Sequence, residues 1–343
     1  MKKNKLKVGI AGYGVVGKKR RIYIDQNPYL ETVCVSDINF SNTGKLEDGV
    51  EFFTDYKDLF QKEIDVLFVS LPNYLASEAT IKGLEYGCHV FCEKPPAKTV
   101  AEVEQVIKIE QKHPELKLKY GFNHRYHGSV KEIKSIIDSN KFGPILSIRA
   151  MYGKSSIIPF SGGWRSEKKY AGGGILLDQG IHMCDLIRFF TGNYDEIYSF
   201  ISNDYWKHDV EDNVFAMMRN KKGQVAMLHS TATQWQHRFR IEVILKEALL
   251  ELTGILSGTK SYGSEKLTII ERVGDEPTGS QNKTTKNYLH DNSWKEEIDE
   301  FADCIVSNRP INNGTSEDAL IVMEMIFKIY QADKTWWKNF YQN

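Results

Sequence analysis

Three residues in this 343-residue chain are of types that carry out hydride and proton transfer. Lys94 lies in a Glu-Lys-Pro step, and an ammonium group there is suited to stabilise negative charge on a developing alkoxide. Asp178 and His182 are four positions apart, so both side chains share a face if the segment is an α-helix. An imidazole takes or returns a proton near neutral pH, and a carboxylate orients it. The three residue types together predict an oxidoreductase site.

Each of these residues also has a plainer explanation. Most lysines are exposed surface groups, and Asp178 is also the kind of charge that a first helical turn favours. Asp178 and His182 are possible metal ligands as well, but a zinc site needs a third and fourth ligand, and no cluster of cysteine and histidine lies nearby in the sequence. Hydride transfer from a nicotinamide needs no metal, and we expect none.

A glycine fingerprint near the start predicts a dinucleotide site. Gly12-x-Gly14-x-x-Gly17 directly follows a strand-like run and opens a candidate helix. These glycines permit a tight turn, close approach of the backbone to a pyrophosphate, and close packing of helix on strand. The N–H groups around Val15 and Val16 and the helix dipole would then bind the phosphates. A purely structural glycine turn is the alternative.

Asp37 favours NAD(H) over NADP(H). It lies twenty positions after Gly17, at the end of the second strand-like run, where a carboxylate accepts hydrogen bonds from the adenosine ribose. A carboxylate there repels a 2′-phosphate. The opposing signal is the basic run Lys18–Arg21, which either places a cation near such a phosphate or forms a solvated first helical turn.

Residues 1–122 are predicted to form a Rossmann dinucleotide-binding domain. Short, continuous apolar runs alternate with segments of helical spacing, and this pattern is typical of a doubly wound parallel sheet. Thr99 is the expected N-cap of one of these helices. The predicted strands are 6–11, 32–37, 65–70, 88–92 and 116–122, and the predicted helices are 73–86 and 99–112.

Residues 123–343 are predicted to form an α+β domain with a mostly antiparallel open sheet, which binds substrate and mediates oligomerisation. Strand-like segments recur at short spacing, and helices are expected at 129–138 and at 176–190, where Thr191-Gly192 ends the second. The polar stretch 274–293 is predicted to be an exposed loop. Two helices, 294–307 and 316–333, are expected to close the chain, and the last one is a candidate to pack back on the first domain.

Composition excludes several classes of partner. The formal net charge is zero and the pI is about 7.1, which provides no electrostatic basis for binding nucleic acid or an anionic membrane. No apolar run approaches the length of a membrane span, and no signal peptide is recognisable at the start. The five cysteines are scattered and odd in number, which favours buried thiols in a reducing cytoplasm over disulfides.

In these motifs the chain resembles the Gfo/Idh/MocA family, the glucose–fructose oxidoreductase and inositol dehydrogenase group. The resemblance covers nearly the whole length. One departure is Ala76, where the family often has a histidine three residues after Pro72-Asn73, and this puts one contact on the cofactor side in doubt. The matching segments are 12–17, LPN at 71–73, GCHVFCEKPPA at 87–97, GFNHRY at 121–126, residues 164–186, and RPINNGTSEDAL at 309–320.

The resemblance implies a role for each of these segments. Lys94 would bind the substrate hydroxyl beside the nicotinamide, and His182, oriented by Asp178, would move the proton. The other implied cofactor contacts are Leu71, Pro72, Asn73 and Glu93, and the other implied substrate contacts are Asn123, Arg125, Trp164 and Arg165. Trp235 and Tyr262 are expected to serve packing or subunit contact more than ligand contact.

We therefore predict a cytoplasmic NAD(H)-dependent sugar dehydrogenase or ketosugar reductase. The expected substrate is a pyranose, a cyclitol or a nucleotide-linked sugar of polysaccharide biosynthesis, and a homodimer or homotetramer is expected by analogy with the family. Two alternatives remain open. One is a glycosidase that uses bound NAD in a transient redox step, and the other is a non-enzymatic dinucleotide-binding sensor, against which the joint presence of Lys94, Asp178 and His182 argues.

Overall fold

The computed structural model describes residues 5–157, 163–257, 261–272 and 281–341 of the chain. These residues form two compact units, each with its own sheet. The first unit comprises Met1–Asn123, Tyr170–Gly172 and Trp294–Leu320, and the second comprises His124–Lys169, Gly173–Ser293 and Ile321–Asn343. Within the described residues, no helix combines the length and the apolar composition needed to cross a bilayer.

A seven-stranded sheet forms the centre of the first unit, in the order β3-β4-β2-β1-β5-β6-β7. All neighbours are parallel except β3 and β4, as the continuous apolar runs predict. The five predicted strands are confirmed, while β3 and β4 are too short to give a sequence signal. The strands are β1 (Leu6–Ala11), β2 (Leu30–Ser36), β3 (Gly44–Lys45), β4 (Glu51–Phe53), β5 (Val66–Val69), β6 (His89–Cys92) and β7 (Leu118–Tyr120).

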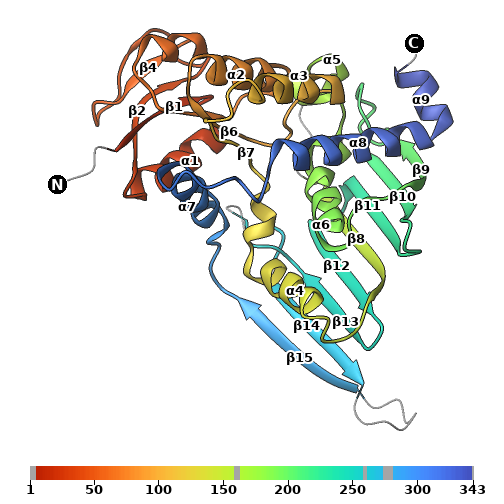
Figure 1. The fold of residues 1–343 in the computed structure, drawn as a ribbon. Helices are drawn as coiled ribbons and strands as arrows, with labels where there is room; N and C mark the ends of the chain where they lie inside the picture. The colour runs from red at the N-terminus through yellow and green to blue at the C-terminus, as the bar shows by residue number, and fades with distance from the viewer. Residues whose placement is uncertain (1–4, 158–162, 258–260, 273–280, 342–343) are drawn as a thin grey trace. The chain divides into compact units, whose positions relative to one another are not determined.

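Helices cover both faces of this sheet. Figure 1 shows α1 (Val15–Gln26) and α7 (Ser293–Val306) on one face, and α2 (Asn73–Glu85) and α3 (Val100–Glu110) on the other. Thr99 caps α3 as predicted, because its side chain accepts a hydrogen bond from the Glu102 N–H. A short 3₁₀ turn, η1 (Tyr56–Gln61), lies between β4 and β5.

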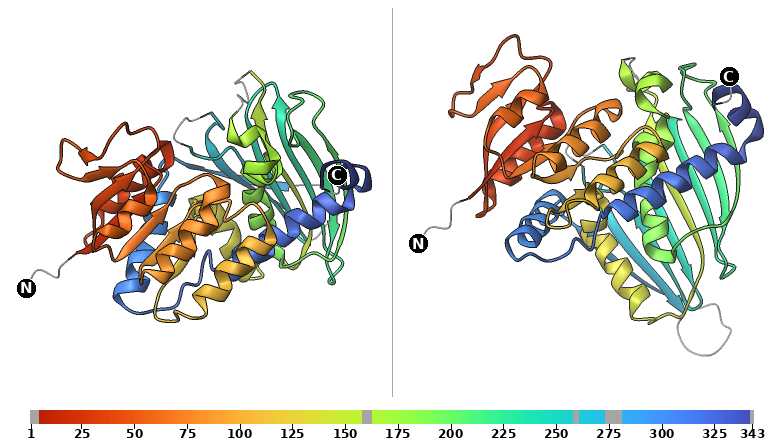
Figure 2. Two further views of the ribbon diagram at one scale, coloured as in Figure 1. Left: turned by 90° about the horizontal axis from the view of Figure 1, so that it is seen from above. Right: turned by 45° about the horizontal axis from the view of Figure 1, so that its top comes forward.

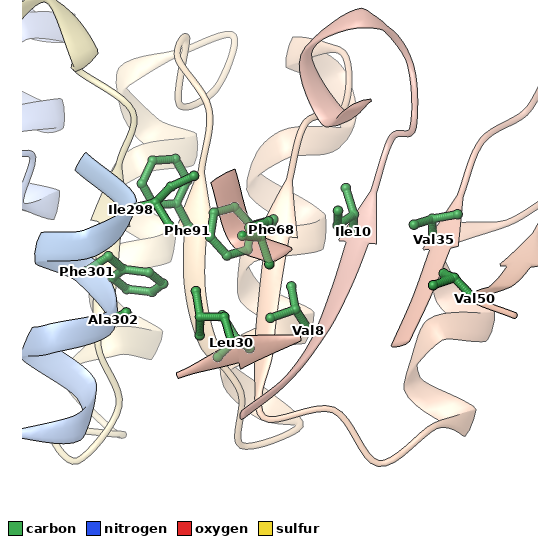
Figure 3. Packing of buried hydrophobic residues seen from close by; sticks show 12 residues of the cluster. Val8, Ile10, Leu30, Val35, Val50, Phe68, Phe91, Ile298, Phe301 and Ala302 are labelled. Atoms are coloured by element: carbon green, nitrogen blue, oxygen red, sulfur yellow. The ribbon is translucent and has the colours of Figure 1, made fainter. Parts of the chain in front are cut away.

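The core of the first unit includes α7, which is far from the sheet strands in sequence. Phe301 of α7 packs edge-on against Phe68 of β5 and Phe91 of β6, with ring centroids 6.0 and 5.6 Å apart (Figure 3). Ile298 and Ala302 belong to the same buried cluster. The late helix therefore completes one side of the nucleotide-binding unit.

An eight-stranded sheet forms the second unit, in the order β15-β14-β13-β12-β8-β11-β10-β9. All neighbours are antiparallel except β8 and β11, which confirms the predicted mostly antiparallel sheet. The strands are β8 (Ile145–Ser155), β9 (Glu196–Ser202), β10 (Asn213–Arg219), β11 (Val225–Gln234), β12 (Arg238–Leu245), β13 (Ala248–Thr253), β14 (Glu265–Arg272) and β15 (Gln281–Tyr288).

Helices of the second unit cover one face of its sheet, as Figures 1 and 2 show for α4, α6 and α8. The further short turns are η2 (Asn123–Tyr126), η3 (Trp164–Ser166), α5 (Lys168–Ala171) and the π-helical turn η4 (Leu176–Gly180). The helices are α4 (Gly128–Asp138), α6 (Ile181–Thr191), α8 (Ser316–Ala332) and α9 (Lys334–Tyr341).

Three predictions for the second half need correction. Residues 281–288 are not loop but the edge strand β15, whose polar, exposed side chains hide its pairing with β14, while 273–280 lie outside the described residues. Residues 176–190 are not one α-helix, because the segment begins with the π-helical turn η4. A further short helix, α9, follows the two closing helices that the sequence predicts.

Candidate active site

The glycine fingerprint forms the turn between β1 and α1. Gly12 has φ of 91°, and a Cβ there would lie 2.4 Å from the Ser70 carbonyl oxygen. A Cβ at Gly17 would lie 2.0 Å from the Gly12 carbonyl oxygen, so both positions require glycine. No side chain caps α1 and no acid lies in its first turn, and Val15 is 88% exposed. This helix end is therefore suited to bind the phosphates of a dinucleotide.

Asp37 borders a cavity of about 600 Å³ next to this turn. Its Oδ1 accepts hydrogen bonds from the Asn39 backbone N–H (3.0 Å) and side-chain amide (2.7 Å), so the carboxylate is held in place. Among the described residues, three carboxylates and one cation line the cavity, and this balance disfavours a 2′-phosphate. The lining residues are Tyr13, Gly14, Lys18, Asp37, Asn39, Phe40, Leu46, Glu47 and Asp48.

The basic run Lys18–Arg21 is, as a group, neither a set of cations beside the cofactor site nor a solvated first helical turn. Arg20 is fully buried, and it pairs with Glu93 (Nε to Oε1, 2.5 Å) and Glu297 (2.8 Å). Arg21 bonds to the Tyr13 hydroxyl at 2.8 Å and pairs with two aspartates, Asp25 and Asp48. Both arginines are thus committed to internal partners, and Lys18 is the member that faces the cavity.

The other predicted cofactor residues follow the carboxyl ends of neighbouring strands. Leu71 and Pro72 follow β5, and Asn73 begins α2, where its side-chain amide donates a 2.7 Å hydrogen bond to the Ala171 carbonyl. Glu93 and Lys94 follow β6, next to β5 in the sheet. Ligands of doubly wound sheets bind at this carboxyl edge. The buried Ala76 stands where the family often has a histidine.

Lys94 and Asn123 extend the same edge of the sheet. Lys94 is half-buried, and the Lys94–Pro95 peptide bond is cis. Asn123 is buried and follows β7, the strand that neighbours β6. Arg20, which clamps the Glu93 carboxylate, supports the residue directly before Lys94. The sequence alone did not identify Arg20, because its partner Glu93 lies seventy-three positions away and the pairing leaves no local sequence pattern.

In the second unit, Asp178 and His182 come from two successive helical turns. Asp178 lies in η4, with its side chain 26% exposed and 3.8 Å from the Nε of Arg165. His182 lies in the first turn of α6 and is 5% exposed. The α-helical spacing on which their shared face was predicted does not hold at η4, and π-helical turns of this kind are frequent at functional sites.

His124 is a further candidate site residue, which sequence reasoning missed. Its ring stacks on that of His182, with centroids 3.8 Å apart and an interplanar angle of 15°. Behind it, His127 bonds through Nδ1 to the buried Glu265 carboxylate at 2.7 Å. His124 lies within GFNHRY, between two residues that the sequence did select, but nothing in that motif indicates a stacking partner.

Arg125 is engaged in a buried ion pair with Asp185 of α6. Its guanidinium approaches both carboxylate oxygens, with Nε 3.1 and 2.9 Å from Oδ1 and Oδ2, and it stacks on Phe189. The pair fixes η2 to the helix that carries His182. The prediction that Arg125 contacts substrate stays a prediction.

The remaining predicted residues differ in exposure. Trp164 and Arg165 lie in η3, where the Arg165 guanidinium stacks 4.2 Å above the Trp164 ring. The Tyr262 hydroxyl donates a 3.1 Å hydrogen bond to Gln179, so this tyrosine packs on η4. Trp235 is 78% exposed.

Lys154 of β8 adds a second cation near Asp178. Burial lowers the pKa of Lys154, while the Asp178 carboxylate acts in the opposite direction. Among the described residues, no group of three or more His, Cys, Asp or Glu side chains is arranged to hold a metal ion.

Comparisons with known proteins agree with both units. A model described as the oxidoreductase family, NAD-binding Rossmann fold, matches residues 6–122, and a model of the GFO/IDH/MocA C-terminal domain matches residues 130–251. The D-glucoside 3-dehydrogenase of Escherichia coli (strain K12) is 25% identical over 360 residues, covering 98% of this chain and 97% of that protein.

Two further matches are more limited in what they show. The inositol 2-dehydrogenase of Salmonella typhimurium (strain LT2) is 31% identical over 160 residues, which is 45% of this chain and 48% of that protein. A solved structure of levoglucosan dehydrogenase in complex with NADH has a TM-score of 0.82 and 20% identity, covering 97% of this chain and 98% of that one. The two family models together match more than two thirds of the residues, and the chain belongs to the Gfo/Idh/MocA family of oxidoreductases, with an NAD-binding Rossmann domain in its N-terminal part.

Proposed function

We propose that this protein transfers a hydride between nicotinamide and a secondary hydroxyl or ketone carbon of a sugar, a cyclitol or a nucleotide sugar, with NAD(H) as cofactor. The observation that carries the proposal is the lone lysine at the carboxyl edge of an NAD-binding sheet, next to the end of β5. Relatives named as glucoside and inositol dehydrogenases support a polyhydroxylated substrate.

The cofactor fits the residues of the first unit. The Gly12–Gly17 turn leaves room for a pyrophosphate, α1 presents an end without a side-chain cap, and Asp37 lines a cavity suited to the adenosine. The further proposed cofactor contacts are Val15, Val16, Leu71, Pro72, Asn73, Glu93 and Lys94. When bound, NAD⁺ accepts the hydride at nicotinamide C4.

Lys94, His182 and Asp178 are proposed as the catalytic residues. In the oxidising direction, His182 takes the hydroxyl proton while the C–H bond gives its electron pair and hydrogen to the cofactor, leaving a ketone. Lys94 donates a hydrogen bond to the oxygen and stabilises its negative charge as the proton leaves. Asp178 stabilises the imidazolium, and reduction follows the same steps in reverse. Asn123, Arg125, Trp164 and Arg165 are proposed to contact the sugar.

The test is a panel of pyranoses, cyclitols and nucleotide sugars, followed at the NADH absorbance band with each cofactor. We expect net reduction of NAD⁺ with at least one member of the panel. Lys94→Ala and His182→Ala should each lower kcat/KM by about 100-fold or more, because each removes charge stabilisation or acid–base catalysis. The affinity for NADH should stay near that of the wild type in His182→Ala.

Two outcomes would contradict the proposal. If both variants turn over at the wild-type rate, the two residues do not carry the chemistry. If the protein instead cleaves glycosides without net formation of NADH, the redox step is transient and the reaction class is different.

We also propose that the protein is a homodimer or homotetramer that assembles through the open face of the second sheet. Exposed apolar side chains gather there on three adjacent strands, and Phe215 lies opposite Phe200 while Met217 lies between Tyr198 and Met227. Eight strands about 4.8 Å apart and about seven residues long give the whole sheet face an area of roughly 900 Å². This area is near the ~800 Å² that each partner of a stable complex buries.

Charged side chains near the middle of this face pair with one another. Arg149 approaches Glu242 at 3.5 Å, and Arg240 pairs with both Glu242 and Glu251. These two arginines and two glutamates balance in charge, so this group adds no net charge to the face.

A cytoplasmic location is proposed as well, because all five cysteines, each within the described residues, are buried free thiols.

A further inference from the structure

Glu211 is a buried carboxylate that the proposed reaction does not use. It lies two residues before β10, is 1% exposed, and belongs to the same unit as Asp178 and His182. A buried carboxylate is costly unless its oxygens accept hydrogen bonds. The groups that donate these hydrogen bonds indicate the role of Glu211.

Both oxygens of Glu211 accept hydrogen bonds from the backbone that leads into η4. Oε2 accepts from the Gly174 N–H at 2.7 Å, and Oε1 accepts from the Leu176 N–H at 3.0 Å. The Glu211 backbone carbonyl accepts from the Ile175 N–H between them, at 3.1 Å. Three consecutive N–H groups therefore bond to one residue. Asp178 follows two positions later, and its own N–H donates to the Gly174 carbonyl at 2.9 Å.

Close contacts leave no room for a side chain at Gly173 or Gly174. A Cβ at Gly174 would lie 2.0 Å from the Glu211 carbonyl oxygen, and a Cβ at Gly173 would lie 2.3 Å from the Tyr330 hydroxyl. That hydroxyl, from the fully buried Tyr330 of α8, donates the third hydrogen bond that the Glu211 carboxylate accepts, at Oε1 over 2.8 Å. The last two glycines of the triple glycine thus serve contact with Glu211 and Tyr330.

We infer that Glu211 is a positioning residue, which holds the start of η4 in place and through it orients Asp178 and His182 for proton transfer. The inference rests on the proposed catalytic role of His182. Three donors face an ionised carboxylate, which has only acceptors, so the charged form fits the site best. Burial raises the pKa of Glu211 to about 7, and the bonds from Tyr330, Gly174 and Leu176 act against that rise. Assays at pH 8.5 or above therefore keep it ionised.

Glu211→Gln is the informative substitution. The amide has one oxygen and one NH₂ group, so in either orientation an NH₂ faces a backbone N–H, and one of the bonds to Gly174 or Leu176 is lost. We expect kcat/KM for the sugar to fall at least tenfold above pH 8.5. The dissociation constant for NADH should change less than twofold, because the proposed dinucleotide contacts belong to the first unit.

The matched control is Asp212→Asn. Asp212 is the next residue, is also buried, and accepts two backbone N–H bonds, both at Oδ2, from Tyr205 and Trp206 at 3.0 and 2.9 Å. Those bonds hold the 204–206 turn and not η4. We expect this variant to keep kcat/KM within threefold of the wild type. An equal loss in both variants would mean that any buried carboxylate in this segment matters only for folding.

A double-mutant cycle separates positioning from general damage. If Glu211 acts through His182, then Glu211→Gln should lower the residual rate of His182→Ala by less than threefold, although it lowers the wild-type rate at least tenfold. The same fractional loss in both backgrounds overturns the inference. Should Glu211→Gln fail to fold, Tyr330→Phe repeats the test, with an expected loss of about three- to fivefold that disappears in the His182→Ala background.

The outcomes also distinguish this inference from the proposed function. If His182→Ala alone leaves the rate unchanged, the proposed function fails. If His182→Ala removes activity while Glu211→Gln and Tyr330→Phe do not lower it, only the positioning role of Glu211 is wrong.

Discussion

Asp37 is the side chain that we propose to set the choice of cofactor. Its carboxylate is fixed by two hydrogen bonds from Asn39 and borders the cavity beside the glycine turn. Glu47 and Asp48 add negative charge to the same lining, and Lys18 is the one cation among its described members. A phosphate on the 2′-oxygen would meet net repulsion there. The ribose hydroxyls of NAD meet a fixed acceptor.

Asp37→Ser should therefore relax the preference for NAD(H). The serine still accepts a hydrogen bond from ribose, but it no longer repels the 2′-phosphate. We expect the ratio of kcat/KM for NAD to that for NADP to fall by about tenfold or more, which corresponds to one charged interaction of roughly 1.4 kcal/mol. Steady-state kinetics with both cofactors measures the ratio. Asn39→Ala serves as the control for loss of local order, and an unchanged ratio in Asp37→Ser would assign the selectivity elsewhere.

At the scale of elements, buried ion pairs connect helices to the strand that precedes Lys94. Arg20 of α1 bonds to Glu93 after β6 and to Glu297 of α7, and its guanidinium stacks on Phe91 and Trp294. Burial raises the pKa of Glu297 to about 7, and Arg20 acts against that rise. The Arg20 guanidinium therefore connects α1, the segment after β6 and α7, which are far apart in the sequence.

Removal of Arg20 should destabilise the protein markedly. Arg20→Ala leaves two carboxylates without their common partner, and we expect the free energy of unfolding to fall by about 3–5 kcal/mol. Chemical denaturation of the first unit, followed by the fluorescence of Trp294, measures the effect. Lys18→Ala on the exposed side of the same helix is the control, with an expected change within about 0.5 kcal/mol. A small effect for Arg20→Ala would mean that water replaces the guanidinium at low cost.

At the scale of the whole molecule, the proposed chemistry leaves the open face of the second sheet unused. His229 lies on this face, stacked on Phe215 with ring centroids 3.9 Å apart and with Nε2 2.9 Å from the Asn213 amide oxygen. Burial lowers the pKa of His229 to about 4. The neutral ring is therefore the form that this face accommodates.

The folded form of the second unit should lose stability in acid. A histidine with a lowered pKa contributes its stability fully above its ordinary pKa of 6.5 and loses it as the pH falls toward 4, because the ring in the unfolded chain binds the proton more readily. We expect the free energy of unfolding to fall as the pH is lowered from 6.5 to 4. Urea denaturation at a series of pH values measures it.

Two variants test the same surface. His229→Gln is neutral at every pH and should remove the part of the acid-induced loss of stability that His229 contributes.

Phe200→Glu should give a monomer at pH 8, because it places a charge opposite Phe215. Light scattering after size-exclusion chromatography measures the molar mass. Arg149, Arg240, Glu242 and Glu251 also lie on this face, so the measurement should be repeated at two salt concentrations. An assembly that resists Phe200→Glu would have its interface elsewhere.

The periodicity of apolar residues was enough to predict the parallel sheet, most of its strands and helices, and the mostly antiparallel second sheet. These elements are predictable because burial of one face imposes a local repeat on the sequence. Edge strand β15 lacked that repeat, since its side chains from Gln281 to Lys286 are exposed and polar. The π-helical turn at Asp178 was also hidden, because the residues that bond to its start, Glu211 and Ser230, are distant in the sequence.

By itself, the sequence determined which residues are candidates for chemistry: the glycine turn, Asp37, Lys94, Asp178 and His182 all follow from residue type, spacing and position. Only the tertiary structure decided what surrounds them. It stacks His124 on His182, buries Arg20 between Glu93 and Glu297, and bonds Glu211 to the segment before Asp178. The physical reason is that local patterns record burial and turn geometry, whereas a buried charge or a stacked ring depends on partners that the fold brings from distant positions.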